Sequence, residues 1–260
     1  MYKWNAQEYA KSSFAQELWA TGLIAKLHLK GNERILDIGC GDGRITAAIA
    51  EQVPNGSVVG IDSSAEMIDF SRSNFPATAH PNLSFELMDA SALTFNGEFD
   101  VVFSSSVLHW VTDHQPVLAG IKRSLKPGGR ILLQMGGKGN AAEMFASFEA
   151  LRKAGKWDKY FANFSAPWNF CGPDEYKRWL AAAGFKNVRA ELVPKDMAQK
   201  GKDGLAGWVR TTWLPYVQRL PDTLREEFVN ELVGEYLACH PLDKEGNAHL
   251  KMVRLEVEAE

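Results

Sequence analysis

The chain has 260 residues, of which 45% are hydrophobic and 23% charged, so it is long enough for one large domain with an appended subdomain. Its formal net charge is -3 and no five consecutive residues are Lys or Arg, which argues against a general nucleic-acid-binding protein, though not against every RNA-modifying enzyme. No apolar run is long enough to span a bilayer, and the first residues lack the apolar region of a signal peptide, so we expect no membrane partner.

The three cysteines, Cys40, Cys171 and Cys239, stand apart in the sequence and form no C-x-x-C pair. A disulfide framework or a structural zinc site is therefore not expected, and a cytoplasmic location fits. His109 and His114 are five residues apart without an H-E-x-x-H pattern, so we expect no bound metal.

One or two helices are predicted over residues 4–29, followed by a mostly apolar strand over residues 34–38 that should be covered on both faces. A loop with Gly39, Gly41 and Gly43 comes next, and these glycines allow a tight turn and the close approach of a ligand. Apolar residues then return at the spacing of a helix. A strand, a glycine-rich loop and a helix in this order predict a cofactor site at the carboxyl end of the strand.

The charges of this loop indicate which cofactor it binds. The nicotinamide fingerprint G-x-G-x-x-G fails, because Arg44 stands in the place of its third glycine. Asp37 and Asp42 would repel a pyrophosphate but suit a ligand with a cationic amine and a cationic sulfur. We therefore interpret the loop as a site for S-adenosylmethionine (SAM), against the alternative of a tight loop with no ligand.

Four further strands are predicted in the first half of the chain, over residues 57–61, 83–87, 99–104 and 130–135. Asp62 ends the first of these, 23 residues after Gly39, near the spacing at which an acidic residue reaches a ribose. Ser63 begins a predicted helix cap, and Met67 in the next turn can lie against an adenine or in the core. The alternation of strands and helices predicts an α/β fold with a parallel sheet covered on both faces.

The second half is expected to be more irregular and more helical. Helix caps are predicted at Thr112 and Asn140, and an exposed turn over residues 200–204. The predicted order after the fifth strand is an aromatic-rich segment over 136–172, a core helix and sixth strand over 173–193, helices over 194–249 and a final strand over 250–260.

The sequence Leu-Asp-Ile-Gly-Cys-Gly-Asp-Gly over residues 36–43 resembles motif I of the class I SAM-dependent methyltransferases. The resemblance implies a Rossmann-like, seven-stranded, mostly parallel sheet whose last strand is antiparallel and lies beside the sixth. It divides the chain into N-terminal helices (1–30), a SAM-binding core (31–135) and a helical lid (136–172 and 194–249). The cofactor contacts that we assign are Asp37, Gly39, Cys40, Gly41, Asp62, Ser63, Met67, Asp89, Ala90 and Ser104, and the product is S-adenosylhomocysteine. In the family, the acid in the place of Asp89 binds the adenine amino group.

A second informative stretch, Leu-His-Trp-Val over residues 108–111, follows the fourth strand, at the sheet edge expected to face the methyl group. With Gln134-Met135, Trp208 to Thr211 and Arg254-Leu255, it resembles the trans-aconitate methyltransferases. Juvenile hormone acid methyltransferases share motif I and the His-Trp step. Those enzymes methylate carboxylates of small molecules, so the resemblance implies a carboxylate acceptor.

An ionised carboxylate is its own nucleophile at neutral pH, so it needs donors to orient it rather than a base. The resemblance implies that Gln16 and Trp110 supply those donors. His109 would act as a base if the acceptor were a hydroxyl. Packing, structural hydrogen bonding and surface exposure are the competing interpretations of these three residues. Arg210 and Arg254 can pair with further carboxylates of a polyacid, although salt bridges within the protein are the favoured interpretation.

We therefore predict a SAM-dependent methyltransferase that acts on a small-molecule carboxylate, as a monomer or a weak homodimer. Two alternatives stay open. The acceptor can be a malonyl group on a carrier protein, a hydroxyl or an amine, or the chain can bind SAM without catalysis. The polar and aromatic residues after the fourth strand favour catalysis, because a binding module would not need them.

Overall fold

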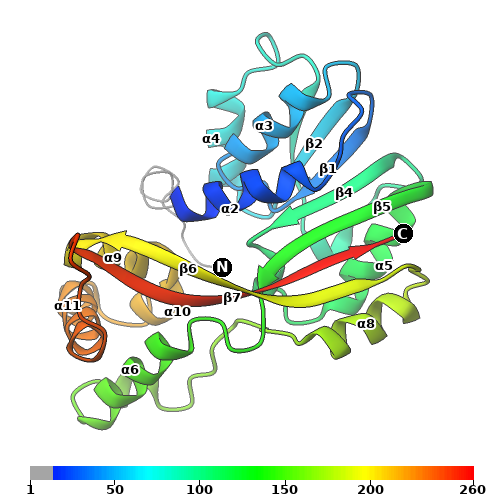
Figure 1. Ribbon diagram of the computed structural model, residues 1–260. Coiled ribbons are helices and arrows are strands. Elements are labelled where there is room, and N and C mark those ends of the chain that lie inside the picture. The colour runs from blue at the N-terminus through cyan, green and yellow to red at the C-terminus, as the bar shows by residue number, and fades with distance from the viewer. Residues whose placement is uncertain (1–13) are drawn as a thin grey trace. The chain divides into compact units, whose positions relative to one another are not determined.

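The sheet of this protein has the strand order β3-β2-β1-β4-β5-β7-β6 (Figure 1). The computed structural model describes residues 14–260, with side chains from residue 19 onward. The strands are β1 (Arg34–Ile38), β2 (Ser57–Asp62), β3 (Leu83–Leu87), β4 (Phe99–Ser105), β5 (Leu125–Gly136), β6 (Arg189–Lys200) and β7 (Asn247–Ala259). Strands β1 to β5 pair in parallel, whereas β7 runs antiparallel to β5. The predicted Rossmann-like fold, with seven strands and an antiparallel last strand beside the sixth, is confirmed in the described residues.

The chain forms two compact units. The sheet unit consists of residues 16–138, 168–193 and 254–260, and the helical unit includes residues 139–167 and 194–253. Strands β6 and β7 each continue from one unit into the other. The segments predicted to form a lid, 136–172 and 194–249, contribute most of the helical unit, and their action as a lid stays a prediction.

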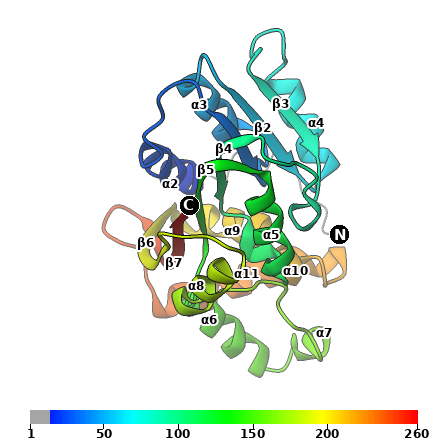
Figure 2. The same cartoon turned by 90° about the vertical axis from the view of Figure 1, so that its right-hand side faces the viewer.

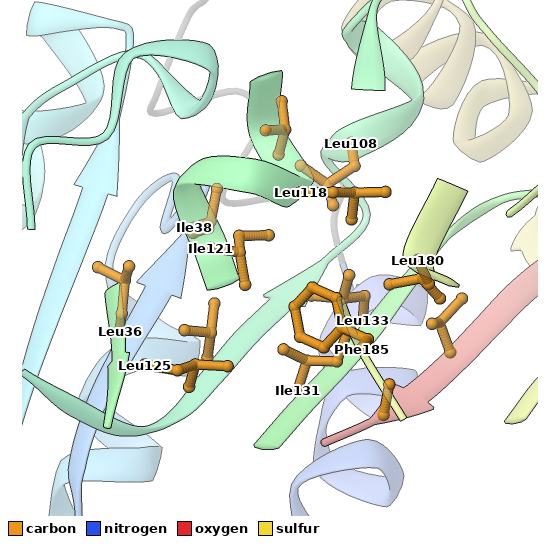
Figure 3. Packing of buried hydrophobic residues seen from close by; sticks show 14 of the residues in the cluster. Leu36, Ile38, Leu108, Leu118, Ile121, Leu125, Ile131, Leu133, Leu180 and Phe185 are labelled. Atoms are coloured by element: carbon orange, nitrogen blue, oxygen red, sulfur yellow. The ribbon is translucent and has the colours of Figure 1, made fainter. Parts of the chain in front are cut away.

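Helices cover both faces of the sheet unit. Helices α2 (Phe14–Ala25), α3 (Arg44–Gln52) and α4 (Ala65–Asn74) contribute to the core on one face, and α5 (His114–Ser124) and α8 (Pro173–Ala182) to the core on the other. Figure 2 shows α2 and α3 on the opposite side of the sheet from α5 and α8. In the second core, Leu36 and Leu133 of the sheet pack with Leu118 and Leu180 of these helices (Figure 3). Because both faces are covered, every residue of β1 after Arg34 is buried.

The sixth and seventh strands are longer than the sequence predicts. Helices were expected from residue 194, but β6 continues to Lys200, and β7 begins at Asn247 instead of residue 250. The turn expected over residues 200–204 is the junction of β6 with α9 (Gly201–Thr212). The two strands are neighbours in the sheet, so their backbone hydrogen bonds outweigh the weak strand pattern of a polar segment.

Three helix caps also differ from the predicted ones. The carboxylate of Asp113, not Thr112, caps α5 by accepting from the Gln115 N–H at 3.0 Å. Ser64, one residue after the predicted Ser63, caps α4. Helix α6 (Ala142–Lys153) follows Ala141 in a left-handed conformation, and Asn140 instead accepts from the Val253 N–H at 3.1 Å. At α4 and α5 the predicted cap lies one residue before the true one, because neighbouring Ser, Thr and Asp compete for the same role, whereas α6 has no side-chain cap.

The aromatic segment after β5 builds the core of the helical unit. The remaining helices of this unit are α7 (Asp158–Phe161), α10 (Leu214–Val217) and α11 (Asp222–Cys239). The ring centroid of Phe148 lies 4.7 Å from that of Tyr216 and 5.0 Å from that of Phe161, which in turn lies 5.6 Å from Phe228. The Trp157 indole N–H donates to Glu231 at 2.7 Å. Edge-to-face and tilted ring contacts of this kind give the unit its own hydrophobic centre.

Within residues 14–260 no helix is long and apolar enough to cross a bilayer. The same residues contain no group of three His, Cys, Asp or Glu side chains that could hold a metal ion.

Candidate active site

The glycine loop between β1 and α3 has positive φ at all three glycines, but the space around the three Cα atoms differs. A Cβ on Gly39 would lie 2.4 Å from the Val107 side chain, and one on Gly43 would lie 2.9 Å from Ser71. A Cβ on Gly41 would meet nothing within 4 Å. Gly39 and Gly43 are therefore required for close packing. Gly41 is the position at which the backbone faces open space that a ligand can approach.

Gly41 is held by hydrogen bonds through both its N–H and its carbonyl. The N–H donates to Asp62 Oδ2 at 3.1 Å, and the carbonyl accepts from the Ser71 hydroxyl at 2.8 Å. Asp62 Oδ1 also accepts from the Ser64 N–H at 2.8 Å, so one carboxylate fixes the loop and the start of α4. We did not predict the role of Ser71, because a serine within a helix gives no sequence signal for a contact 30 residues away.

Asp37, in β1 just before the glycine loop, is buried, with an exposed fraction of 2%. Burial raises its pKa to about 7, against the effect of a 2.7 Å hydrogen bond from the Thr46 hydroxyl, and repulsion from Asp62 adds to the rise. Burial also raises the pKa of Asp62, although backbone N–H donors oppose this. Asp42 forms an ion pair with Arg44 at 2.8 Å. Asp37 and Asp62 are thus two acidic groups beside the loop whose ionised forms a cationic ligand would favour.

Two of the predicted cofactor residues, Ser63 and Asp89, are exposed where β2 and β3 end. Asp89 begins the short 3-10 helix η1 (Ala90–Ala92), and its carboxylate accepts from the Ser91 N–H at 2.7 Å. Ala90 is half-buried beside it. These positions are compatible with the predicted contacts to a ribose and an adenine, which stay predictions.

Three other predicted cofactor residues, Cys40, Met67 and Ser104, have buried side chains. The Ser104 hydroxyl donates to the Ile38 carbonyl at 2.8 Å, across two strands of the sheet. Burial raises the pKa of the Cys40 thiol well above its usual range. The side chains of these three residues contribute to packing around the loop, and their contacts with a cofactor stay predictions.

The loop after β4 contacts the glycine loop directly, through Val107 and Gly39. It leads into the short 3-10 helix η2 (Leu108–Trp110), which carries His109 and Trp110. The prediction that this stretch lies beside the glycine loop therefore agrees with the arrangement of the sheet unit.

His109 has a hydrogen bond that fixes the position of its proton. Its Nδ1 accepts from the Gly136 N–H at 3.3 Å. Burial, with the positive charge of Arg254, lowers the pKa of His109 well below its usual value. The ring is therefore neutral at pH 7, and the hydrogen bond assigns its proton to Nε2. In this geometry the Nδ1 of His109 is occupied by the Gly136 N–H, and its Nε2 is a donor.

Trp110 belongs to a half-buried cluster of four rings. Its ring centroid lies 5.4 Å from that of Trp168 in an edge-to-face contact, and Trp168 stacks on Phe170 at 6.0 Å. The His109 ring lies 5.8 Å from Phe170 and 5.9 Å from Trp110. The backbone also joins the segments, since the Asn169 N–H donates to the His109 carbonyl at 2.8 Å. The sequence predicted Trp110 as a site residue but not its aromatic partners.

The remaining predicted substrate residues differ in their surroundings. Gln16 lies in α2, but its side chain is outside the described residues. Arg210 forms a two-pronged ion pair with Glu226 of α11, at 2.9 and 2.8 Å. Arg210 therefore forms the salt bridge that the sequence favoured, and its contact with the substrate stays a prediction. Arg254 is 3% exposed, and its Nη2 donates to the Ser106 hydroxyl at 2.7 Å.

A mostly parallel sheet with this strand order defines a class I methyltransferase fold. The glycine loop follows β1, an acidic residue ends β2, and a polar aromatic loop follows β4, all at the carboxyl edge of the parallel strands. In open sheets of this kind, ligands bind at that edge.

Comparisons with known proteins agree with this class. A family model described as a methyltransferase domain matches residues 29–184. An uncharacterized methyltransferase of Schizosaccharomyces pombe is 31% identical and covers 88% of this chain and 89% of its own. A trans-aconitate 2-methyltransferase of Methylobacterium nodulans is 28% identical, with 98% and 97% covered. A solved structure of a methyltransferase from Bacillus halodurans has a TM-score of 0.62 at 18% identity, with 92% and 97% covered, which shows a common fold.

The chain therefore belongs to the methyltransferase-domain family. Its fold and its relatives make it an enzyme of the SAM-dependent methyltransferase class.

Proposed function

We propose that the enzyme transfers the methyl group of SAM to a carboxylate of a small molecule, as trans-aconitate 2-methyltransferases are named for doing. The observation that carries the proposal is the direct packing of Val107 on Gly39. It joins the loop that carries His109 and Trp110 to the loop that we assign to the cofactor. An acceptor that contacts Trp110 would therefore lie next to the cofactor loop.

The chemistry of the glycine loop fits SAM. Gly41 has open space where a side chain would be, which allows the backbone to contact a ligand. The buried Asp37 and the half-buried Asp62 favour a ligand with positive charge, since its charge would reduce the cost of ionising them. SAM supplies an activated methyl group on its sulfonium sulfur. The protein then has to align the acceptor and exclude water.

The state of His109 supports a carboxylate acceptor over a hydroxyl. A hydroxyl would need a base, but Nδ1 of His109 already accepts from Gly136 and Nε2 carries the proton. A carboxylate is ionised at neutral pH and needs only orientation. The Trp110 indole N–H is suited to donate to one carboxylate oxygen, while the rings of Trp168 and Phe170 exclude water from the surroundings.

A screen of small carboxylic acids with SAM tests the proposal. The purified protein is incubated with trans-aconitate and a panel of mono-, di- and tricarboxylates, and release of S-adenosylhomocysteine and methyl ester is measured. At least one acid should be methylated. Trp110→Phe keeps most of the ring bulk but deletes the donor, and should lower kcat/KM about 10- to 100-fold, the effect of losing a hydrogen bond to a charged group.

Trp179→Phe makes the same change on α8 and serves as the matched control. SAM affinity should be nearly unchanged in both variants. If Trp110→Phe methylates the acid as fast as the wild type, Trp110 does not orient the acceptor. If His109→Gln alone abolishes turnover of a hydroxyl compound, the acceptor is a hydroxyl and the carboxylate proposal is wrong.

A further inference from the structure

The short helix η2, which carries His109 and Trp110, has few hydrogen bonds of its own. The Trp110 N–H donates to the Val107 carbonyl at 2.9 Å, and the Val111 N–H donates to the Leu108 carbonyl at 3.0 Å. A single 3-10 turn of this kind has poorer hydrogen-bond geometry than an α-helix and fixes few residues by itself. The orientation of Trp110 therefore depends on what η2 packs against.

Asn169 supplies hydrogen bonds on both sides of Trp110. Its backbone N–H donates to the His109 carbonyl at 2.8 Å, and its side-chain amide donates to the Thr112 carbonyl at 3.1 Å. A carbonyl can only accept, so the amide nitrogen of Asn169 has to face Thr112. One residue thus holds the chain immediately before Trp110 and again two residues after it, and all four residues belong to the sheet unit.

The two neighbours of Asn169 place aromatic rings on the same short helix. Trp168 lies edge to face with Trp110 at 5.4 Å, and the Phe170 ring lies 5.8 Å from that of His109. Ring pairs are favourable over a range of centroid distances, whereas a hydrogen bond weakens steeply away from its preferred distance and angle. The rings therefore cover η2, and the directional bonds of Asn169 set its orientation.

The segment that carries Asn169 is itself anchored in the sheet unit. The Cys171 carbonyl accepts from the Lys138 N–H at 3.0 Å, two residues beyond the end of β5, and the Cys171 side chain is buried in the core. Helix α8 begins two residues later, at Pro173. Asn169 thus links η2 to a fixed part of the fold.

We propose that Asn169 is a positioning residue for the acceptor site, which fixes η2 so that the Trp110 indole N–H is aimed at the acceptor. Asn169 acts through Trp110 and needs no contact of its own with the acceptor or with SAM. The inference rests on the proposed function, because that function gives Trp110 the task of orienting the acceptor.

Substitutions of the Asn169 side chain test the proposal, and each of them keeps the backbone N–H. With an acid that the wild type methylates, Asn169→Ala should lower kcat/KM about 3- to 10-fold, the effect of losing one neutral hydrogen bond. Asn169→Asp has nearly the same shape but places a carboxylate oxygen against the Thr112 carbonyl, so its loss should be larger. SAM affinity should be nearly unchanged in both variants.

A double-mutant cycle separates the positioning of Trp110 from a general structural role. If Asn169 acts through Trp110, the variant with both Asn169→Ala and Trp110→Phe should be about as slow as Trp110→Phe alone. Asn82→Ala is the matched control, because the Asn82 amide also donates to backbone carbonyls, those of Ala50 and Val53, but precedes β3 at the opposite edge of the sheet. This control should leave kcat/KM unchanged.

A spectroscopic measurement tests the positioning without any acceptor. In protein labelled with fluorotryptophan, the fluorine resonance of Trp110 is identified by its absence from Trp110→Phe. Asn169→Ala should shift or broaden this resonance, and Asn82→Ala should not. In the wild type the Asn169 backbone N–H should exchange slowly with solvent, a measurement that requires no variant to fold.

The outcomes separate this inference from the proposed function. The inference is overturned if Asn169→Ala leaves either kcat/KM or the Trp110 resonance unchanged, or if the losses of the two single variants multiply in the double variant. Exchange of the Asn169 N–H as fast as that of an unstructured amide would also overturn it. If the Trp110 resonance responds to Asn169→Ala but the wild type methylates no acid, the link between Asn169 and Trp110 stands and the proposed function fails.

Discussion

The buried carboxyl group of Asp37 makes a prediction about stability that depends on pH. Its pKa of about 7 in the folded protein compares with an ordinary value of 3.8. Between these values the folded state holds a proton that the unfolded state has lost, so the contribution of Asp37 to stability falls as pH rises through this range. A shift of about three pKa units corresponds to ~4 kcal/mol at 1.36 kcal/mol per unit. Asp37 is only 2% exposed, so solvent screening lowers this free energy only slightly.

Asp37→Asn removes the ionisable group and keeps a carbonyl oxygen for the Thr46 hydroxyl. Chemical unfolding of the cofactor-free proteins is measured from pH 4.5 to 8.5. The wild type and Asp37→Asn should have similar free energies of unfolding near pH 4.5. The variant should become more stable than the wild type by roughly 2–4 kcal/mol above pH 7. Asp100→Asn is the matched control with the opposite sign, because Lys126 and a backbone N–H lower the pKa of Asp100 against the effect of burial. A stability difference for Asp37→Asn that does not change with pH would refute the reasoning.

The cofactor should reverse this preference for the protonated form. A cationic ligand next to the glycine loop favours ionised Asp37, so SAM binding should release protons near pH 7. Calorimetry in buffers with different ionisation enthalpies measures that release. Wild type should release protons, and Asp37→Asn should release fewer and bind SAM more weakly. Equal proton release by the two proteins would show that Asp37 does not respond to the cofactor.

Four further substitutions test other parts of the protein. Gly39→Ala should lower the free energy of unfolding by roughly 2–5 kcal/mol, because its Cβ would collide with Val107 at a positive φ. Gly41→Ala should mainly weaken SAM binding. Chemical unfolding measures the first effect and calorimetry the second, and equal losses of stability in the two variants would contradict the roles assigned to the two glycines. Asp62→Asn should weaken SAM binding by roughly 1–3 kcal/mol, and unchanged affinity in a folded variant would exclude a role in cofactor binding. Glu256 is buried and paired with Lys26 and Arg189, and its pKa lies below the usual value because these partners outweigh burial. The stability that ionised Glu256 contributes is therefore lost in acid, and Glu256→Gln should be destabilised less by acid than the wild type. Identical pH profiles of stability for the two proteins would contradict this.

The sequence predicted those features that depend on local pattern. The apolar strand before Gly39 and the alternation of strands and helices were sufficient for the fold class, because parallel strands covered on both faces have a distinctive composition. The position of Asp62 at the end of β2 also followed from spacing along the chain. The lengths of β6 and β7 could not be predicted in this way, because pairing between strands that are distant in sequence determines them.

The contacts that position the candidate site could not be predicted from local pattern. Ser71 contacts Gly41, and Val107 contacts Gly39, only after distant segments have packed together. The protonation of His109 depends on the Gly136 N–H, which lies 27 residues away. A sequence shows which residue types are present, but tertiary packing determines their donors, acceptors and burial.

Methyl transfer from isotopically labelled SAM tests the central claim most directly. The protein is incubated with methyl-labelled SAM and the acid panel that includes trans-aconitate, and the labelled product is treated with mild base. A methyl ester releases labelled methanol under these conditions, whereas methyl groups on ether oxygen, nitrogen or carbon are retained. We expect labelled product whose label is released by base. No labelled product from any acid, or a label that resists base, would contradict transfer to a carboxylate.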